Sequence, residues 1–394
     1  MGKQVKLINL MLLVAMMVSS AGCQIFIRPS AENSSKSTAN QAEEARKREY
    51  DHPLPDFNSM QFAWFYKPPE NPPDFAQLET NYSLFILTRN DEAERDQLAE
   101  DGAQGDILQY LRFEAIMDPE DCQSKPFQNQ AANLEGDFCQ IKNNHPDWFL
   151  KDINNNPVRF NESGYFVMDP GNPDWQSFFQ DRITGFQKDG GWKGIFLDNV
   201  DASLGRYTAL GNLLNQYPDD KSFQDAIAAH LAKLSNDLRD KQHKLVFANI
   251  TYLREPEVWL RYLAYLDGAM MEAFAADWDN GYISELEWLS QLEIAEKTQT
   301  KGKTIILVTQ GGPDDRRRML FGLASFLLVN NGQAYYRYSN DEAYRKVWWY
   351  PEFNIDLGQP LGPRYKLEGS WRRDFENGSV KVDLTNNIGE IVLN

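Results

Sequence analysis

The chain has 394 residues, 42% of them hydrophobic and 13% aromatic, which is enough for a large core such as a barrel of about 250 residues. Its formal net charge is −17 and no basic stripe stands out, which argues against a nucleic-acid partner. The four histidines form no HxH or HExxH pair, so we expect no histidine-rich catalytic metal site and no cofactor.

The first 23 residues have the pattern of an export signal. Lys3 and Lys6 precede an apolar run over 7–18, which is shorter than the roughly 20 residues that span a bilayer. The run ends in Ser-Ala-Gly-Cys at 20–23, which resembles a bacterial lipoprotein signal, with an ordinary cleaved secretory peptide as the alternative. We therefore expect an extracytoplasmic protein that is held on a bacterial membrane by a lipid at Cys23.

Residues 24–58 are rich in Ser, Asn, Ala, Gln, Glu and Lys and show no apolar period, which predicts a disordered tether. Strand-like apolar runs follow at 62–66, 82–88, 107–117, 194–197, 245–248, 267–271, 304–308 and 334–336. Helical stretches lie between most of them, at 175–188, 223–241, 255–265, 282–298 and 316–329. Eight alternating units favour an α/β fold, a (β/α)8 TIM barrel over residues 59–350. No glycine-rich phosphate fingerprint follows the first run, which argues against a dinucleotide-binding fold.

Two segments lie outside this alternation. Residues 118–171 are too long for an ordinary loop between strand and helix, and long loops of this kind usually carry function. Cys122 and Cys139 lie within this segment and are either disulfide-bonded or two free thiols; we favour the disulfide. Residues 351–394 contain a hairpin signal at Asn377-Gly378, which predicts a small C-terminal β segment that caps the end of the barrel.

Two acidic residues follow clean apolar runs, where a barrel places its active site. Asp198 ends the run at 194–197, and Glu272 ends the run at 267–271. Glycoside hydrolysis needs two carboxyl groups, so we interpret Asp198 as the nucleophile and Glu272 as the acid/base. The structural alternatives are a helix N-cap at Asp198 or Asp201, and an ion pair between Glu272 and Arg337.

Further polar and aromatic residues fall near the same level of the barrel. The candidates for substrate binding are Tyr66, Lys67, Arg112, Glu114, Asn199, Asn249, Gln310, Tyr336, Arg337 and Trp348. Sugars stack on aromatic rings, which adds Trp64, Trp148, Trp278 and Trp349, although core packing is the alternative for each of them.

Several motifs together resemble a known family. They are the run at 194–199, His-Pro-Asp-Trp-Phe-Leu-Lys-Asp at 145–152, Asp-Pro-Gly-Asn-Pro-Asp-Trp at 169–175, and the tail motifs at 357–362 and 372–378. This combination, which covers about 62–382, resembles the TIM-barrel enzymes of a hypothetical glycosyl hydrolase family. It is more distantly similar to barrel α-galactosidases and endo-α-1,4-polygalactosaminidases. The α-galactosidase pattern implies the same roles for Asp198 and Glu272, although those enzymes carry Asp at the second position.

The sequence therefore predicts an extracytoplasmic glycoside hydrolase that cleaves a polysaccharide or glycan, with retention of anomeric configuration, through two carboxylates. One alternative is a non-catalytic carbohydrate-binding lipoprotein on a barrel scaffold. Another is a metal-dependent hydrolase, which would need converging His and Asp ligands.

Overall fold

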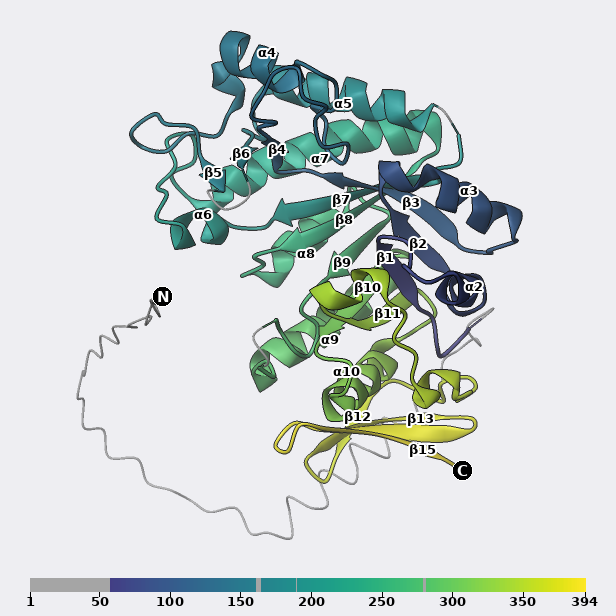
Figure 1. The fold of residues 1–394 in the computed structure, drawn as a ribbon. Coiled ribbons are helices and arrows are strands. Elements are labelled where there is room, and N and C mark those ends of the chain that lie inside the picture. The colour runs from purple at the N-terminus through teal and green to yellow at the C-terminus, as the bar shows by residue number, and fades with distance from the viewer. Residues whose placement is uncertain (1–56, 161–163, 189, 279–280) are drawn as a thin grey trace, which may run out of the picture.

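The computed structural model describes residues 57–160, 164–188, 190–278 and 281–394, and its core is a parallel barrel (Figure 1). The strands follow the order β1-β2-β3-β7-β8-β9-β10-β11. They are β1 (Ala63–Tyr66), β2 (Leu84–Leu87), β3 (Asp106–Arg112), β7 (Gly194–Asp201), β8 (Leu245–Thr251), β9 (Gly268–Met271), β10 (Thr304–Gln310) and β11 (Ala334–Ser339). A parallel bridge between Phe62 and Tyr336 brings β11 to the start of β1, so the sheet is nearly closed. The predicted barrel is confirmed.

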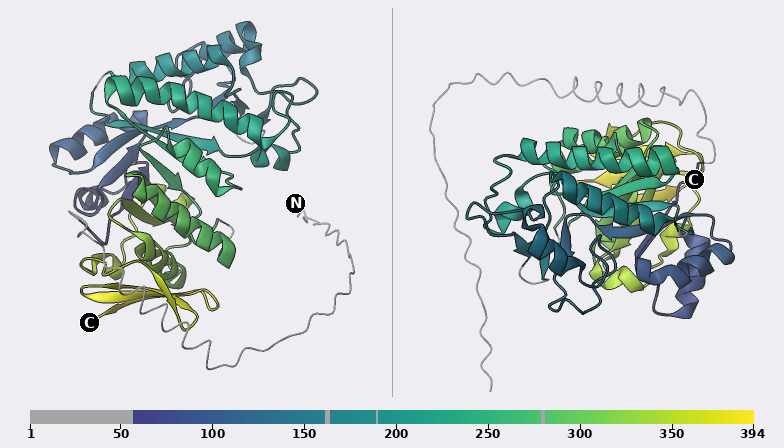
Figure 2. Two further views of the ribbon diagram at one scale, coloured as in Figure 1. Left: turned by 180° about the vertical axis from the view of Figure 1, so that it is seen from behind. Right: turned by 90° about the horizontal axis from the view of Figure 1, so that it is seen from above.

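Helices follow most of the strands and lie outside them (Figure 2). They are α2 (Pro72–Asn81), α3 (Glu92–Glu100), α5 (Pro173–Gln187), α6 (Gly205–Ala209), α7 (Asp220–Gln242), α8 (Pro256–Leu263), α9 (Glu285–Thr300) and α10 (Arg316–Val329). Of these helices, α2, α3 and α6 were not predicted from the sequence. Leu98 is the one large apolar residue of α3. This helix therefore lacks the apolar stripe from which a helix is predicted in a sequence.

Side-chain alternation divides the strands into an inner and an outer apolar layer. The inner layer fills the barrel with residues that come from the strands alone: Ala63, Phe65, Leu84, Ile86, Leu108, Phe196, Phe247, Met270, Ile306 and Val308. The residues between them, such as Ile195 and Leu197 of β7, face the helices and belong to the larger outer core. A residue two positions beyond an inner-layer residue therefore also points into the barrel.

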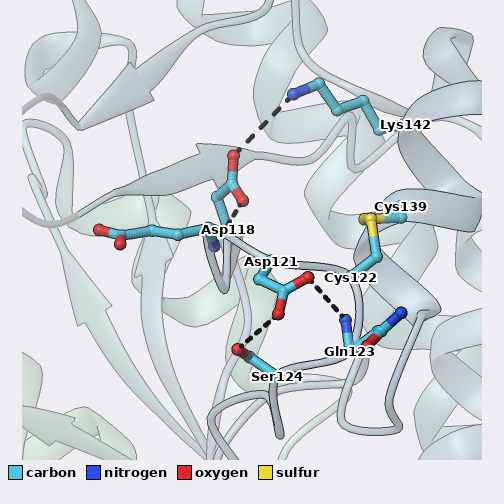
Figure 3. Close-up of a disulfide and its surroundings, with 8 residues drawn as sticks. Asp118, Asp121, Cys122, Gln123, Ser124, Cys139 and Lys142 are labelled. Atoms are coloured by element: carbon cyan, nitrogen blue, oxygen red, sulfur yellow. Dashed lines mark hydrogen bonds and ion pairs between the residues drawn. A yellow bond between two sulfur atoms is a disulfide. The ribbon is translucent and has the colours of Figure 1, made fainter.

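The long segment between β3 and α5 is folded rather than irregular. It contains β4 (Ala115–Met117), α4 (Asp137–Asn144), the short helix η2 (Pro146–Trp148), β5 (Arg159–Phe160) and β6 (Tyr165–Val167), whose strands form a three-stranded sheet. A disulfide joins Cys122, in the turn after β4, to Cys139 on α4 (Figure 3). Lys142 of the same helix reaches Asp118 at 3.9 Å and adds a second, weaker link.

The C-terminal segment is a four-stranded antiparallel sheet of β12 (Tyr365–Leu367), β13 (Ser370–Phe375), β14 (Gly378–Asp383) and β15 (Ile388–Leu393). The expected position at the barrel's end is wrong, because this sheet lies against α9 and α10 (Figure 1). The buried guanidinium of Arg373 donates to the carbonyl oxygens of Leu327 and Asn330 at the end of α10, which have no partner within the helix. Arg364 binds Glu296 of α9 through two hydrogen bonds of 2.8 and 3.1 Å.

The disulfide gives the first testable prediction. Replacing Cys122 and Cys139 together with serine should lower the free energy of unfolding by about 3 kcal/mol, because the bond closes a loop across a sequence separation of 17. Urea unfolding of the wild type and the double variant measures this difference. Gln123→Ala, an exposed change in the same turn, is the control, and equal stability of all three proteins would contradict the prediction.

Candidate active site

A polar layer lies directly above the apolar filling of the barrel. On five strands, the residue two positions beyond an inner apolar residue is polar: Tyr110 after Leu108, Asp198 after Phe196, Asn249 after Phe247, Glu272 after Met270 and Gln310 after Val308. Because these strands are parallel, the polar residues all lie toward the carboxyl ends of the strands, where barrel enzymes have their active sites.

Asp198 is held by three hydrogen-bond donors. The hydroxyl of Tyr110 donates to Oδ2 at 2.5 Å, and the amide of Asn199 donates to the same oxygen at 3.0 Å. Asn249 donates to Oδ1 at 3.1 Å. Three donors that converge on one carboxylate stabilise its negative charge and fix its orientation.

Asn249 also links Asp198 to Glu272. Its Nδ2 is 3.1 Å from Asp198 Oδ1 and 2.8 Å from Glu272 Oε2, so the two carboxyl groups share one donor. Burial and, to a smaller extent, the negative charge of Asp198 together raise the pKa of Glu272 to about 7. The two predicted carboxyl groups thus meet, in environments that favour a protonated Glu272 near neutral pH. Gln310 supports the second of them by donating to the Glu272 backbone oxygen at 2.6 Å.

Neither structural alternative for these two residues is observed. The N-cap of α6 is Leu204 and that of α7 is Asp219, so neither Asp198 nor Asp201 closes the helix that follows. Arg337 donates to the backbone oxygens of Phe65 and Ala343 and does not serve as the counter-ion of Glu272.

A second charged cluster lies beside Asp198. Glu114 accepts from Arg112 at 2.7 Å and from Arg206 at 3.3 Å. Arg206 also donates to Asn199 Oδ1 at 2.6 Å and pairs with Asp201 at 3.3 Å. Burial raises the pKa of Glu114 to about 7, although both arginines act in the opposite direction. The cluster fixes Asn199, and through it one side of Asp198.

Asn199 itself has a left-handed backbone, with φ of 59°, at a bulge where the register between β7 and β8 shifts. Asn tolerates this conformation better than most residues other than glycine. The bulge allows Asp198 and Asn199 to point to one site although they are consecutive in the strand.

Tyrosines surround the other side of Asp198. The ring of Tyr66 lies 4.5 Å from that of Tyr110 and 5.8 Å from that of Tyr344. Burial raises the pKa of Tyr66 to about 12, so its hydroxyl stays a hydrogen-bond donor. Lys67 lies over the Tyr66 ring, 5.1 Å from its centre, and donates to Thr88 at 3.4 Å.

Three residues of this site were missed from the sequence. Tyr110 could have been found, because it lies between Leu108 and Arg112 on the inward face of β3. Arg206 lies on α6 and Tyr344 on η3 (Asp341–Arg345), which are short elements outside the strand tips. No pattern in the sequence singles out these two residues.

Other predicted binding residues are placed elsewhere. The prediction that Tyr336 binds substrate is wrong. Tyr336 is fully buried and packs on Phe326 of α10, because it alternates with the inward-facing Tyr335 and Arg337. Arg337 is also wrong as a binding residue, since it is 4% exposed and its guanidinium is used by backbone oxygens. Trp348 is half-buried against Tyr338, on the outward side of β11, which gives no support for a binding role.

Most of the predicted stacking aromatics are core residues. Trp64 and Trp148 are buried, and Trp349 packs against Phe62. Trp278 is the exception, with 44% of its surface exposed.

A cavity of about 780 Å³ opens beside Glu272. It lies between the loops after β8 and β9, and Asn199, Arg206, Asn249, Tyr252, Glu272 and Trp278 are among its lining residues. Its size is typical of a small-molecule site. Within the described part of the chain, no three His, Cys, Asp or Glu side chains are grouped as ligands for a metal ion.

The chain belongs to Hypothetical glycosyl hydrolase family 15, whose model matches residues 107–379. The matched region contains Asp198, Glu272 and the cavity between their loops, and it confirms the family resemblance read from the sequence motifs. No curated protein matches the sequence.

The chain is also similar to solved structures of a glycoside hydrolase domain and an α-galactosidase. The glycoside hydrolase domain of PelA from Pseudomonas aeruginosa is 18% identical, with a TM-score of 0.48, over 73% of this chain and 97% of that one. An α-galactosidase from Lactobacillus brevis is 11% identical, with a TM-score of 0.44, over 89% of this chain and 48% of that one. These values are too low to transfer a substrate.

The raised pKa of Glu272 predicts how stability depends on pH. Because the folded-state pKa of about 7 exceeds the ordinary 4.5, folding favours the protonated form, and the wild type should lose stability as pH rises from 4.5 through 7. Glu272→Gln cannot ionise, so relative to wild type it should gain about 3 kcal/mol between pH 4.5 and pH 8. Urea unfolding at both pH values checks this, with the exposed Glu100→Gln as control. A stability difference that is the same at both pH values would contradict it.

Proposed function

We propose that the protein is a glycoside hydrolase that cleaves a glycan with Asp198 as nucleophile and Glu272 as acid/base. The observation that carries the proposal is the shared Asn249 amide, which holds both carboxyl groups within 3.1 Å of one nitrogen atom. Asp198 accepts three hydrogen bonds, as an attacking carboxylate should. Glu272 has the raised pKa of a group that must give a proton to the leaving oxygen.

Glu114 also has a raised pKa, but it is a poorer acid/base candidate than Glu272. Its side chain is 4% exposed and is held by two arginines, whereas Glu272 lines the large cavity. A proton donor must reach the glycosidic oxygen, which favours Glu272. We assign Glu114, Arg112 and Arg206 to positioning Asn199 and Asp198.

The geometry supports retention of anomeric configuration. A nitrogen 3.1 Å from one carboxylate oxygen and 2.8 Å from the other keeps those oxygens within about 6 Å of each other. Retaining enzymes have carboxyl groups about 5–5.5 Å apart, and inverting enzymes about 6.5–9.5 Å, which leaves room for a water molecule. Asp198 would then form a glycosyl–enzyme bond, which water cleaves after Glu272 removes its proton.

A screen of the purified protein against polysaccharides and aryl glycosides tests the proposal. Asp198→Asn and Glu272→Gln should each lower kcat at least about a hundredfold, because each removes one of the two groups that the reaction needs. Glu272→Gln should lose less activity on aryl glycosides with acidic phenol leaving groups, which need little protonation. The wild-type rate should fall as pH rises through about 7, and this limb should disappear in Glu272→Gln.

Glu100→Gln again serves as the control. Full activity in either carboxylate variant would contradict the assignment. Glycan binding with no turnover by the wild type would instead support the carbohydrate-binding alternative.

We also propose that the enzyme acts outside the cytoplasm on a lipid anchor. The disulfide between Cys122 and Cys139 supports an oxidising compartment. Cys23 and the predicted signal and tether, apart from residues 57 and 58, lie outside the described residues. Among the described residues, no helix is long and apolar enough to cross a membrane.

Substitution of Cys23 tests the anchor. Cys23→Ser should move the protein from the membrane fraction to the soluble fraction, because the acyl chains supply the membrane affinity. Immunoblots of cell fractions measure this shift, with Cys122→Ser as a control that keeps the lipid site. A variant that stays with the membrane would show that the predicted anchor is wrong.

A further inference from the structure

Two exposed aromatic side chains mark the cavity beside Glu272. Among the residues that the structure describes, Tyr252 and Trp278 are the aromatic side chains that are exposed, at 47% and 44%, and both line this cavity. Water-exposed aromatic rings in a groove are what a sugar face needs for stacking. Tyr252 also has a left-handed backbone, with φ of 52°, which is a strained placement for a bulky residue.

The cavity offers a polar group as well as stacking surfaces. Asn249 is 1% exposed and lines the cavity, and its Nδ2 is used by Asp198 and Glu272. Its Oδ1 is buried and receives no hydrogen bond from the described part of the protein. A buried acceptor of this kind is costly unless a partner arrives, and a sugar hydroxyl would supply the donor.

The position of the cavity decides which part of a glycan it would hold. Glu272 lines it, whereas Asp198 is enclosed by Tyr110, Asn199 and Asn249 and is not among its lining residues. The acid/base protonates the oxygen of the leaving group, so the leaving group lies on the side of Glu272. A cavity of about 780 Å³ is several times larger than one sugar ring.

Resting on the proposed function, we propose that this cavity binds the leaving-group side of an oligosaccharide chain, with Trp278 and Tyr252 as stacking platforms. The leaving group of the substrate would then contain more than one sugar unit bound beyond the scissile bond. Arg206 lies over the Tyr252 ring, 5.1 Å from its centre, and holds this ring in place. Trp278, the second stacking residue, lies in the loop that follows β9 and contains Glu272.

A glycan array with homologous oligosaccharide series of graded length tests the proposal. The probe protein is the full chain carrying Glu272→Gln, which should bind without turnover. We expect one series to bind with a signal that grows with chain length. Adding Trp278→Ala should weaken binding to the longer members about tenfold, and Trp278→Phe should restore most of it. Leu361→Ala, an exposed apolar change outside the cavity, should have no effect.

Two results would overturn the proposal: no binding to any series, or binding that Trp278→Ala leaves unchanged. Hydrolysis separates this inference from the proposed function. Wild-type cleavage that depends on Asp198 and Glu272 but not on Trp278 would leave the enzyme assignment intact and remove only the stacking platform. If Trp278→Ala lowers the rate of cleavage of the bound series more than the rate of aryl glycoside cleavage, both proposals are supported.

Discussion

One amide group holds the candidate site together. Asn249 donates to Asp198 and to Glu272 from the same nitrogen, so two carboxyl groups that would repel each other are kept close. Their proximity in turn makes a proton on Glu272 favourable, since burial and the charge of Asp198 act in the same direction. The acid/base assignment, the inferred retention and the side on which the leaving group lies all follow from this pairing.

The sequence was sufficient for the barrel and for its two central carboxylates. Buried strands of a parallel sheet are apolar throughout, so each strand and its first polar residue could be read directly. The alternation of side chains along each strand adds further information. It would have added Tyr110 to the predicted site and removed Tyr336, which faces α10. The position of a strand end does not by itself give the direction of each side chain, because a shift of one residue along the strand reverses that direction.

Residues outside the strands were harder to find. Arg206 belongs to a five-residue helix. Its role depends on Glu114, which lies between β3 and β4, and on Asn199 and Asp201 of β7. Contacts between distant segments leave no local pattern, so only the assembled structure shows them. The same applies to the C-terminal sheet, whose strands were partly visible at Asn377-Gly378, but whose position depends on Arg364 and Arg373 binding helices far away in the chain.

The seam between β1 and β11 has a consequence for how the chain folds. Arg337 donates to the backbone oxygen of Phe65, across 272 positions of sequence, and Tyr336 bonds to Gln61 beside it. Contacts of such long range slow folding, because the entropy of closing the loop is lost before the contact forms. The outer edge of β1 therefore finds its partner only when nearly the whole polypeptide is present. Until then the unpaired edge can pair with other chains, which makes partly folded molecules prone to aggregation.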